Sequence, residues 1–157
     1  MAYSYLKLIH LAAVIIFLGN IITGLFWMMI AVKTKDLKII NHTMQGIIKA
    51  DRYFTIPGVI VVTAGGILAA IHAKLPILQT GWIFWSVIMF SASGLVFTIK
   101  LVPLQKTICK LTLNKETADG FNWEEFSKAY LAWDIWGLIA LLTPLSALVM
   151  MVLKIPK

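Results

Sequence analysis

Long apolar segments alternate along this chain with shorter stretches that carry nearly all of its charge. No Asp, Glu, Lys or Arg occurs in residues 8–32, 54–73, 75–99 or 135–153. A helix that crosses the hydrocarbon core of a bilayer needs roughly 20 apolar residues. The pattern therefore predicts one all-α integral membrane domain over residues 1–157, a bundle of four antiparallel transmembrane helices. We expect these helices at about residues 6–31, 54–73, 80–101 and 131–153.

Composition and the placement of basic residues support a membrane protein with a defined orientation. Apolar residues make up 60% of the chain and charged residues only 13%, which differs strongly from soluble domains. Lys and Arg concentrate in the two long connections, and such residues are retained on the cytoplasmic side. We therefore expect both connections in the cytoplasm and both termini on the outer side of the cell's inner membrane. The basic residues concerned are Lys33, Lys35, Lys38, Lys49 and Arg52, then Lys100, Lys106, Lys110, Lys115 and Lys128.

Tryptophan and tyrosine favour the two membrane interfaces, and in this sequence they occur near the predicted helix ends. Those expected at the outer interface are Tyr3, Tyr5 and Trp82, and those expected at the inner interface are Trp27, Tyr53, Tyr130 and Trp133. We interpret most of these side chains as membrane anchors.

The two basic connections are predicted to be helical extensions of the membrane helices rather than coil. Between residues 37 and 48, apolar residues recur at helical spacing among lysines, so we expect this segment to lie against the inner leaflet. Asn122 and Glu125 have the spacing of a capping box, and Phe121 with Phe126 that of a hydrophobic staple. The last helix should then begin in the cytoplasm and run for about 48 Å at 1.5 Å per residue.

Small residues and prolines indicate where the predicted helices pack closely or bend. The second helix is rich in glycine and alanine, and packing within lipid relies on contact between small side chains. We therefore expect this helix at the centre of the bundle, facing the third helix. The small residues are Gly58, Gly65, Gly66, Ala69 and Ala70, opposed by Ser86, Ser91, Ser93 and Gly94. Pro57 and Pro144 predict bends in the second and fourth helices.

Few polar side chains fall within the predicted membrane segments, and each is a candidate functional residue because its burial in lipid is costly. The candidates are His10, Asn20, His72 and, at the inner boundary, Asp134. Asp134 should pair with Arg52, which lies beside Asp51 at comparable depth, and so tie the second helix to the fourth. Asn20 is expected to form hydrogen bonds between helices.

The two histidines of the membrane segments are predicted at the outer ends of antiparallel helices, so their imidazoles should lie at the same depth. Neutral imidazole is the usual axial ligand of haem b. We therefore consider a haem b site with His10 as the ligand and His72 as the second ligand. The pocket would be lined by Phe17, Gly24, Gly65 and Ala69. Two simpler interpretations stay open, in which His10 forms a hydrogen bond across the bundle and His72 faces water.

Copper is an alternative metal for this end of the bundle, because thioether sulfur together with imidazole suits it. Met150 and Met151 are predicted at the outer end of the fourth helix. Methionine in a membrane helix is otherwise a packing residue.

Motifs of common soluble enzymes do not occur in the sequence. It has no phosphate-binding glycine loop with its lysine, no nucleophile elbow and no H-E-x-x-H, which argues against a hydrolase or an NTPase. The net charge of +7 does not indicate nucleic-acid binding, since the basic residues lie between apolar segments rather than beside aromatics on one surface.

Several short motifs keep their order along nearly the whole chain. They are KLIH at 7–10, DRYFTIPG at 51–58, GW at 81–82, LVPLQ at 101–105, AW at 132–133 and MMV at 150–152. This pattern resembles the bacterial integral-membrane family catalogued as domain of unknown function 2269, and the resemblance implies a membrane fold.

A more distant resemblance involves His10, Trp27 and the run from Asp51 to Tyr53 before Pro57. These residues are similar to those of HemJ-type protoporphyrinogen oxidases and CopD-type copper-resistance membrane proteins. In the HemJ type the histidine of the first helix is held to ligate haem b, so the resemblance implies that His10 is the ligand. This sequence departs from that pattern in having no intramembrane lysine and no clear second ligand.

Together these observations predict a membrane haem b protein that passes electrons between an apolar donor such as quinone and an acceptor near the outer face. Such a protein would be an oxidoreductase. The alternative is a cofactor-free accessory subunit that packs the small residues of the second helix against a larger membrane complex, or a homo-oligomer. Transport of a small solute or of copper is the third possibility.

Overall fold

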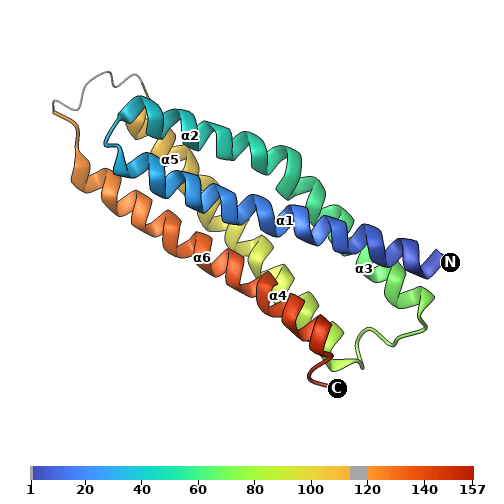
Figure 1. The fold of residues 1–157 in the computed structure, drawn as a ribbon. Coiled ribbons are helices and arrows are strands. Elements are labelled where there is room, and N and C mark those ends of the chain that lie inside the picture. The colour runs from blue at the N-terminus through green and yellow to red at the C-terminus, as the bar shows by residue number, and fades with distance from the viewer. Residues whose placement is uncertain (1, 114–119) are drawn as a thin grey trace.

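The computed structural model describes residues 2–113 and 120–157, and these residues form helices joined by short turns (Figure 1). In chain order the helices are α1 (Ala2–Lys33), α2 (Leu37–Ala50), α3 (Ile56–His72), α4 (Gly81–Val96), α5 (Val102–Thr112) and α6 (Trp123–Leu153). Two π-helical segments, η1 (Asp51–Thr55) and η2 (Phe97–Leu101), connect α2 to α3 and α4 to α5. Lys115, assigned above to a cytoplasmic connection, lies outside the described residues.

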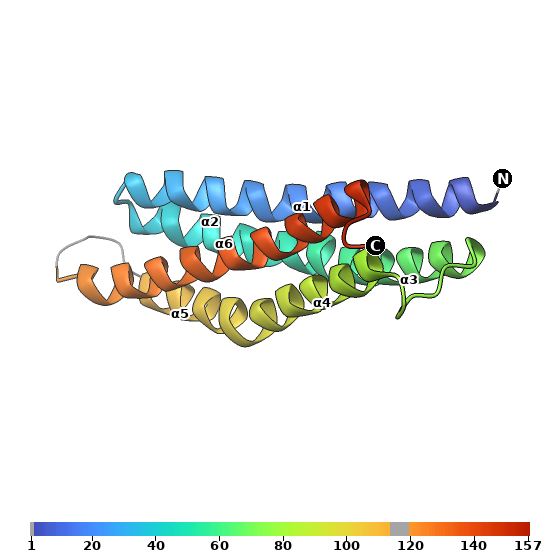
Figure 2. The same cartoon turned by 90° about the horizontal axis from the view of Figure 1, so that it is seen from below.

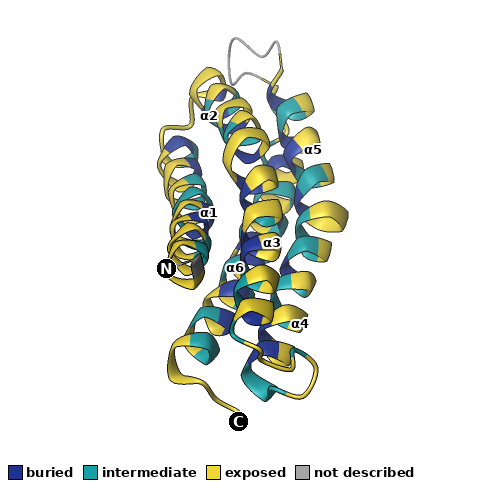
Figure 3. Cartoon of the chain, turned by 90° about the vertical axis from the view of Figure 1, so that its right-hand side faces the viewer, coloured by how far each residue is buried: buried dark blue, intermediate teal, exposed yellow. Residues whose placement is uncertain are grey.

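Four continuous helical rods are long and apolar enough to cross a membrane, which confirms the predicted number of membrane helices. The rods are Tyr3–Lys33, Leu37–His72, Gly81–Thr112 and Trp123–Leu153. Many residues on the outer surfaces of the rods are exposed (Figure 3). They include large apolar side chains such as Ile15, at 71% exposure, and Val152, at 69%. Lipid tails solvate such a surface, whereas water does not. The fold is therefore an all-helical integral membrane bundle.

Each π segment precedes a proline. Pro57 and Pro103 occupy the second position of α3 and α5. Proline has no N–H, and its ring clashes with the carbonyl four residues earlier, which belongs to Tyr53 in η1 and to Ile99 in η2. The wider π turn accommodates this clash, and Figure 2 shows the α4–α5 rod bending at η2. At Pro57, where the sequence predicts a bend, the helix thus changes to π-helical geometry, and the same change precedes Pro103.

The membrane helices pack as two close pairs, α1 with α3 and α4 with α6. The glycine face of α3 lies against α1, because a Cβ added at Gly65 would be 3.3 Å from the Cβ of His10. Between the pairs, the rings of Phe17 and Phe90 are 5.5 Å apart. The prediction that this glycine face opposes the third membrane helix is therefore wrong. The close approach that small residues allow is made to α1 instead.

Two serines of α4 face α6. The Ser86 hydroxyl donates to the Ala147 carbonyl at 3.1 Å, and the Ser93 hydroxyl donates to the Ala140 carbonyl at 2.7 Å. Ala140 lies four residues before Pro144, so its carbonyl has no helical N–H partner. Ser93 supplies the missing donor, and α6 continues as one helix through Pro144.

α2 and α5 extend the bundle at the end that holds the α1–α2 turn, while both termini lie at the other end (Figure 1). The apolar side of α2 is inside the bundle, with Leu37 at 4% exposure and Ile40 and Met44 at 0%. These residues share a core with Met28 of α1 and Phe126 of α6. The predicted helical extension is thus confirmed, but the expected contact of its apolar side with the inner leaflet is wrong, because α1 and α5 cover that side.

The start of α6 agrees with the sequence prediction. Asn122 is the N-cap, and its side chain accepts a hydrogen bond from the Glu125 backbone N–H at 3.1 Å. The Phe121 and Phe126 rings lie 5.8 Å apart across the cap. The capping box and the hydrophobic staple are both present.

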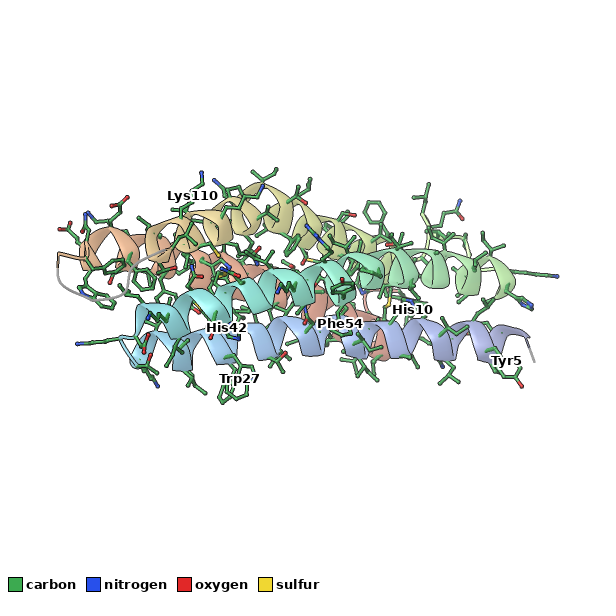
Figure 4. The ribbon with its side chains drawn as sticks, turned by 90° about the horizontal axis from the view of Figure 1, so that it is seen from above. Tyr5, His10, Trp27, His42, Phe54 and Lys110 are labelled. Atoms are coloured by element: carbon green, nitrogen blue, oxygen red, sulfur yellow. The ribbon has the colours of Figure 1, made fainter. Side chains whose placement is uncertain are left out.

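The aromatic side chains divide between lipid-facing and interior positions. Tyr5 and Trp27 point away from the bundle (Figure 4) and are 64% and 58% exposed. Trp133 does not anchor the protein at an interface as predicted, since it is 3% exposed. Its position in the interior makes it part of the site described next.

Candidate functional site

Asp51, the first residue of η1, is 8% exposed and holds a cluster of polar side chains in the interior. Its Oδ1 accepts hydrogen bonds from Asn20 Nδ2 at 3.1 Å and from Thr55 Oγ1 at 2.8 Å. Its Oδ2 accepts a hydrogen bond from Gln105 Nε2 at 2.8 Å. Asn20 Nδ2 also donates to Thr55 Oγ1 at 2.9 Å. One carboxylate thus links α1, η1 and α5.

All three donors to Asp51 are neutral, and within the described part of the chain this carboxylate forms no ion pair. A carboxylate offers about four acceptor positions, so the one that remains is on Oδ2. Removing a charge from water costs several kcal/mol, and neutral hydrogen bonds recover only part of that cost. The electrostatics of the cluster therefore favour binding of a cation.

Arg52 does not supply this cation. Successive residues of a helix point in different directions around its axis, so Arg52 is exposed where Asp51 is buried. Arg52 also forms no ion pair with Asp134 in the described ranges, because η1 packs on α1, α2 and α3 rather than on α6. The predicted tie between Arg52 and Asp134 is wrong. Asp51 makes the interhelical connection instead, through neutral partners.

A cavity of about 60 Å³ adjoins the cluster, and residues from every helix and both π segments line it. Its polar lining includes Asn20, Asp51 and Gln105, and the remaining wall is mostly apolar, with Phe17 and Phe90 among the contributors. Roughly 10 to 15 Å³ on this measure holds one water. The cavity therefore has room for about four non-hydrogen atoms.

The wall of the cavity also includes Trp133, which carries a buried hydrogen-bond donor. Its indole lines the wall and is 3% exposed. Of the buried side-chain nitrogen and oxygen atoms in the residues described, Trp133 Nε1 alone has no hydrogen-bond partner. A buried donor without an acceptor costs about 1–3 kcal/mol. Asp51 thus retains an acceptor position, whereas the Trp133 donor is enclosed by protein atoms.

Sequence reasoning found part of this cluster. The interhelical hydrogen bonds predicted for Asn20 are confirmed, but the roles of Asp51, Thr55 and Gln105 were missed. A signal existed for two of them. Counting back from Gly58 by three and then by four residues reaches Thr55 and Asp51, so the buried face of α3 continues through η1. Gln105 lies in a segment assigned to a cytoplasmic connection, and nothing in its spacing indicated burial.

His10 and His72 lie on facing helices but at different levels. His10 Nδ1–H donates to the Val62 carbonyl at 2.9 Å, between α1 and α3 (Figure 4). His72 is exposed, with its ring 6.5 Å from the ring of Tyr3. Tyr3 is separated from His10 by about 10 Å along α1 at 1.5 Å per residue. The expected common depth is therefore wrong, and the hydrogen bond across the bundle considered for His10 is present.

The residues predicted to line a haem pocket do not form one. Phe17 and Gly24 line the Asp51 cavity, whereas His10 itself covers Gly65 at the close approach given above. Ala69 lies further along α3 and is half-buried. Because α1 and α3 touch at this level, no space for a porphyrin exists between them. The residues present do not fit a haem held between His10 and the second predicted histidine.

The sulfur and imidazole groups considered for copper are not brought together. Met150 lines a hollow on the surface of α6 with Val149 and Pro156, and the lining of that hollow contains no histidine. His10 and His72 lie along the contact between α1 and α3.

These observations define the class of the protein as a four-helix integral membrane protein with a buried polar site. The chain belongs to the family of predicted integral membrane proteins DUF2269, whose family model matches residues 4–155. This match confirms the first resemblance stated from the sequence, while the more distant one to the HemJ and CopD types stays a prediction. No curated protein and no solved structure matches the chain.

Proposed function

We propose that this chain is a small membrane carrier that binds a small cation on Asp51, between the α1–α3 and α4–α6 helix pairs. Of the three functions considered from the sequence, small-solute transport agrees best with the geometry. One observation carries the proposal. A carboxylate that is 8% exposed has only neutral partners, retains a free acceptor position and borders a cavity of about 60 Å³.

Ionisable residues inside membrane bundles are costly in free energy and therefore rare. Those that occur commonly mark ion and substrate pathways. A purely structural connection does not require a charge. An asparagine at position 51 would accept from Asn20 and Thr55 in the same way, and Gln105 would turn its amide over to accept from the new NH₂ group. An ionisable carboxyl group at this buried position is therefore best explained by a positively charged ligand.

The two rods that contain η1 and η2 change locally from α-helical to π-helical geometry beside the cavity, a change that is frequent at functional sites. Here η1 and η2 occupy corresponding positions before Pro57 and Pro103. The first and fifth residues of both segments line the cavity, namely Asp51 and Thr55 in η1 and Phe97 and Leu101 in η2. Both π segments thus border the proposed binding site.

The small residues of α3, which favoured an accessory subunit, pack within the chain itself. The glycines expected to pack against a partner protein lie against α1, as Gly58 does against Phe17, where an added Cβ would be 3.4 Å from the Phe17 Cβ. This internal packing removes the main argument for a partner at that face.

Cation flux into lipid vesicles tests the carrier proposal. Purified protein is reconstituted with a pH-sensitive dye inside the vesicles, and outward or inward gradients of protons, potassium or methylammonium are imposed. We expect Asp51→Asn to lower the flux of the transported cation to that of protein-free vesicles. Asp134→Asn is the matched control, because Asp134 is a half-buried carboxylate on α6 that does not line the cavity. Equal flux in Asp51→Asn and wild-type vesicles would refute the proposal.

Haem b at His10 stays a separate prediction, with one observation in its favour. The hydrogen bond from His10 Nδ1–H to Val62 sets the tautomer in which Nε2 carries the free lone pair, as in ligating histidines. The test is the visible spectrum of purified protein, first air-oxidised and then reduced with dithionite. A Soret band that disappears in His10→Ala would support this prediction, and a spectrum without a Soret band would remove it.

A further inference from the structure

The polar end of the Asp51 cavity is rich in hydrogen-bond acceptors that the protein leaves unfilled. Oδ2 of Asp51 accepts a single hydrogen bond, from Gln105, and so retains an acceptor position. Asn20 and Gln105 contact Asp51 through their amide nitrogens. Their amide oxygens accept no hydrogen bond from any residue that the structure describes. Three side chains thus present free acceptors in one cluster.

The two amide oxygens are accessible to an incoming group. Both side chains line the cavity. Among the described side-chain nitrogen and oxygen atoms that protein encloses, Trp133 Nε1 alone lacks a hydrogen-bond partner. The oxygens of Asn20 and Gln105 also lack a partner, so neither of them is enclosed. A ligand in the cavity can therefore reach both oxygens.

Covalent geometry places the Gln105 oxygen near the free position on Asp51. Gln105 Nε2 is 2.8 Å from Asp51 Oδ2, and the oxygen of an amide lies roughly 2.2 Å from its nitrogen. The two oxygens are therefore at most about 5 Å apart. An ammonium nitrogen lies about 2.8 Å from each of its acceptors, so it bridges oxygens up to about 5.6 Å apart. One ligand group can thus bind Asp51 and Gln105 together.

The rest of the cavity suits an apolar group. Phe17, Phe90 and Phe97 belong to its wall, and its volume of about 60 Å³ corresponds to about four non-hydrogen atoms. Hard metal cations such as Ca²⁺ and Mg²⁺ take about six or more oxygen ligands, which is more than the three polar side chains supply. An alkyl group instead packs against the apolar wall without requiring ligands there.

Resting on the proposed function of Asp51 as a cation site, we propose that the ligand is a primary alkylammonium ion of up to about four non-hydrogen atoms. Its three N–H groups donate to Asp51 Oδ2 and to the side-chain oxygens of Gln105 and Asn20. The bond to the carboxylate is charge-assisted and therefore the strongest, so Asp51 supplies most of the affinity. The two amide oxygens supply selectivity for a primary over a tertiary ammonium ion.

The selectivity is testable with two isomeric ions. n-Propylammonium and trimethylammonium have the same formula and charge, but the first carries three N–H groups and the second carries one. We expect wild-type protein in detergent to bind n-propylammonium about tenfold more tightly, as measured by isothermal titration calorimetry, because each neutral hydrogen bond lost costs about threefold. Gln105→Leu removes one of the two amide oxygens, so the preference should fall to about threefold.

The ratio of the two affinities makes the result specific. Loss of the hydrogen bond from Gln105 to Asp51 affects both ions alike, so the ratio reports the oxygen alone. Gln45→Leu is the matched control, since Gln45 is an exposed glutamine of α2 that does not line the cavity, and it should keep the wild-type preference. If Gln105→Leu fails to fold, Asn20→Ala removes the other amide oxygen and should lower the preference to the same extent.

The outcomes separate this inference from the carrier proposal. Equal binding of the two ions by wild-type protein would overturn recognition by the amide oxygens, as would a tenfold preference that persists in Gln105→Leu. Displacement of n-propylammonium by sodium chloride but not by choline chloride would overturn the alkylammonium ligand in favour of a metal ion. Asp51→Asn should weaken binding of both ammonium ions. If it leaves both affinities unchanged, or if wild-type protein binds neither ion, the cation site itself fails.

Discussion

The hydrogen bond from Ser93 to Ala140 permits a sharp test of how α6 tolerates an internal proline. The bond measures 2.7 Å, and both residues are buried at 2% exposure. It satisfies a carbonyl that Pro144 leaves without its helical partner. Interhelical hydrogen bonds in membrane proteins contribute about 0.6 kcal/mol on average and up to about 1.7 kcal/mol. A carbonyl with no other partner belongs near the upper end of that range, so Ser93→Ala should lower the unfolding free energy by about 1–2 kcal/mol.

A double-mutant cycle isolates the contribution of this carbonyl. In Pro144→Ala, the new backbone N–H donates to Ala140, so the serine becomes redundant and Ser93→Ala should cost less than about 0.5 kcal/mol in that background. The unfolding free energy is measured by circular dichroism during titration of mixed micelles with dodecyl sulfate. Ser86→Ala is the control, because its acceptor Ala147 is not four residues before a proline and should cost the same in both backgrounds. An equal cost of Ser93→Ala with and without Pro144 would refute the reasoning.

Two further predictions concern the packing of α1 and the start of α2. Gly66→Ala places a Cβ 3.1 Å from His10 Cε1, so the ring must shift by a few tenths of an ångström. Gly19→Ala meets nothing within 4 Å and gains the same helix propensity, so Gly66→Ala should be less stable than Gly19→Ala by about 1–3 kcal/mol in the same titration. Equal stability of the two variants would contradict the packing described. Asp36 caps α2 by accepting from two backbone N–H groups at 2.8 and 3.2 Å, so Asp36→Ala should cost about 1 kcal/mol and Asp36→Asn nearly nothing. The same titration in mixed micelles checks this, and a loss in Asp36→Asn as large as in Asp36→Ala would show that the charge rather than the cap matters.

The existence of four membrane helices followed directly from the uncharged segments, because lipid leaves a chain few ways to satisfy its backbone. The pairing of those helices did not. In a water-soluble protein the apolar face of a helix is the buried face. In a membrane protein apolar residues cover both the helix–helix contacts and the lipid-facing surface. The glycine face of α3 therefore predicted a close contact without identifying α1 as the partner. The register of α1 against α3, which places His10 and His72 at different depths, could not be predicted from the sequence either.

The candidate site shows the same limit at the level of single residues. Asp51 and Arg52 are adjacent, and the choice of Arg52 as the interior residue assumed that a basic side chain would pair with Asp134. Helical spacing from Gly58 points to Asp51 instead. The interior position of Trp133 depends on how α6 packs against its neighbours, and the burial of Gln105 depends on how far the bundle continues beyond η2 (Figure 2). Neither follows from local sequence.

The proposed binding of a cation by the buried carboxylate can be tested on that group itself. A difference infrared spectrum of the protein in lipid, recorded before and after addition of methylammonium, reports changes in carboxyl stretching bands. We predict a change that disappears in Asp51→Asn and persists in Asp134→Asn. A spectrum without any carboxyl change, or a change that persists in Asp51→Asn, would contradict the assignment of Asp51 as the binding group.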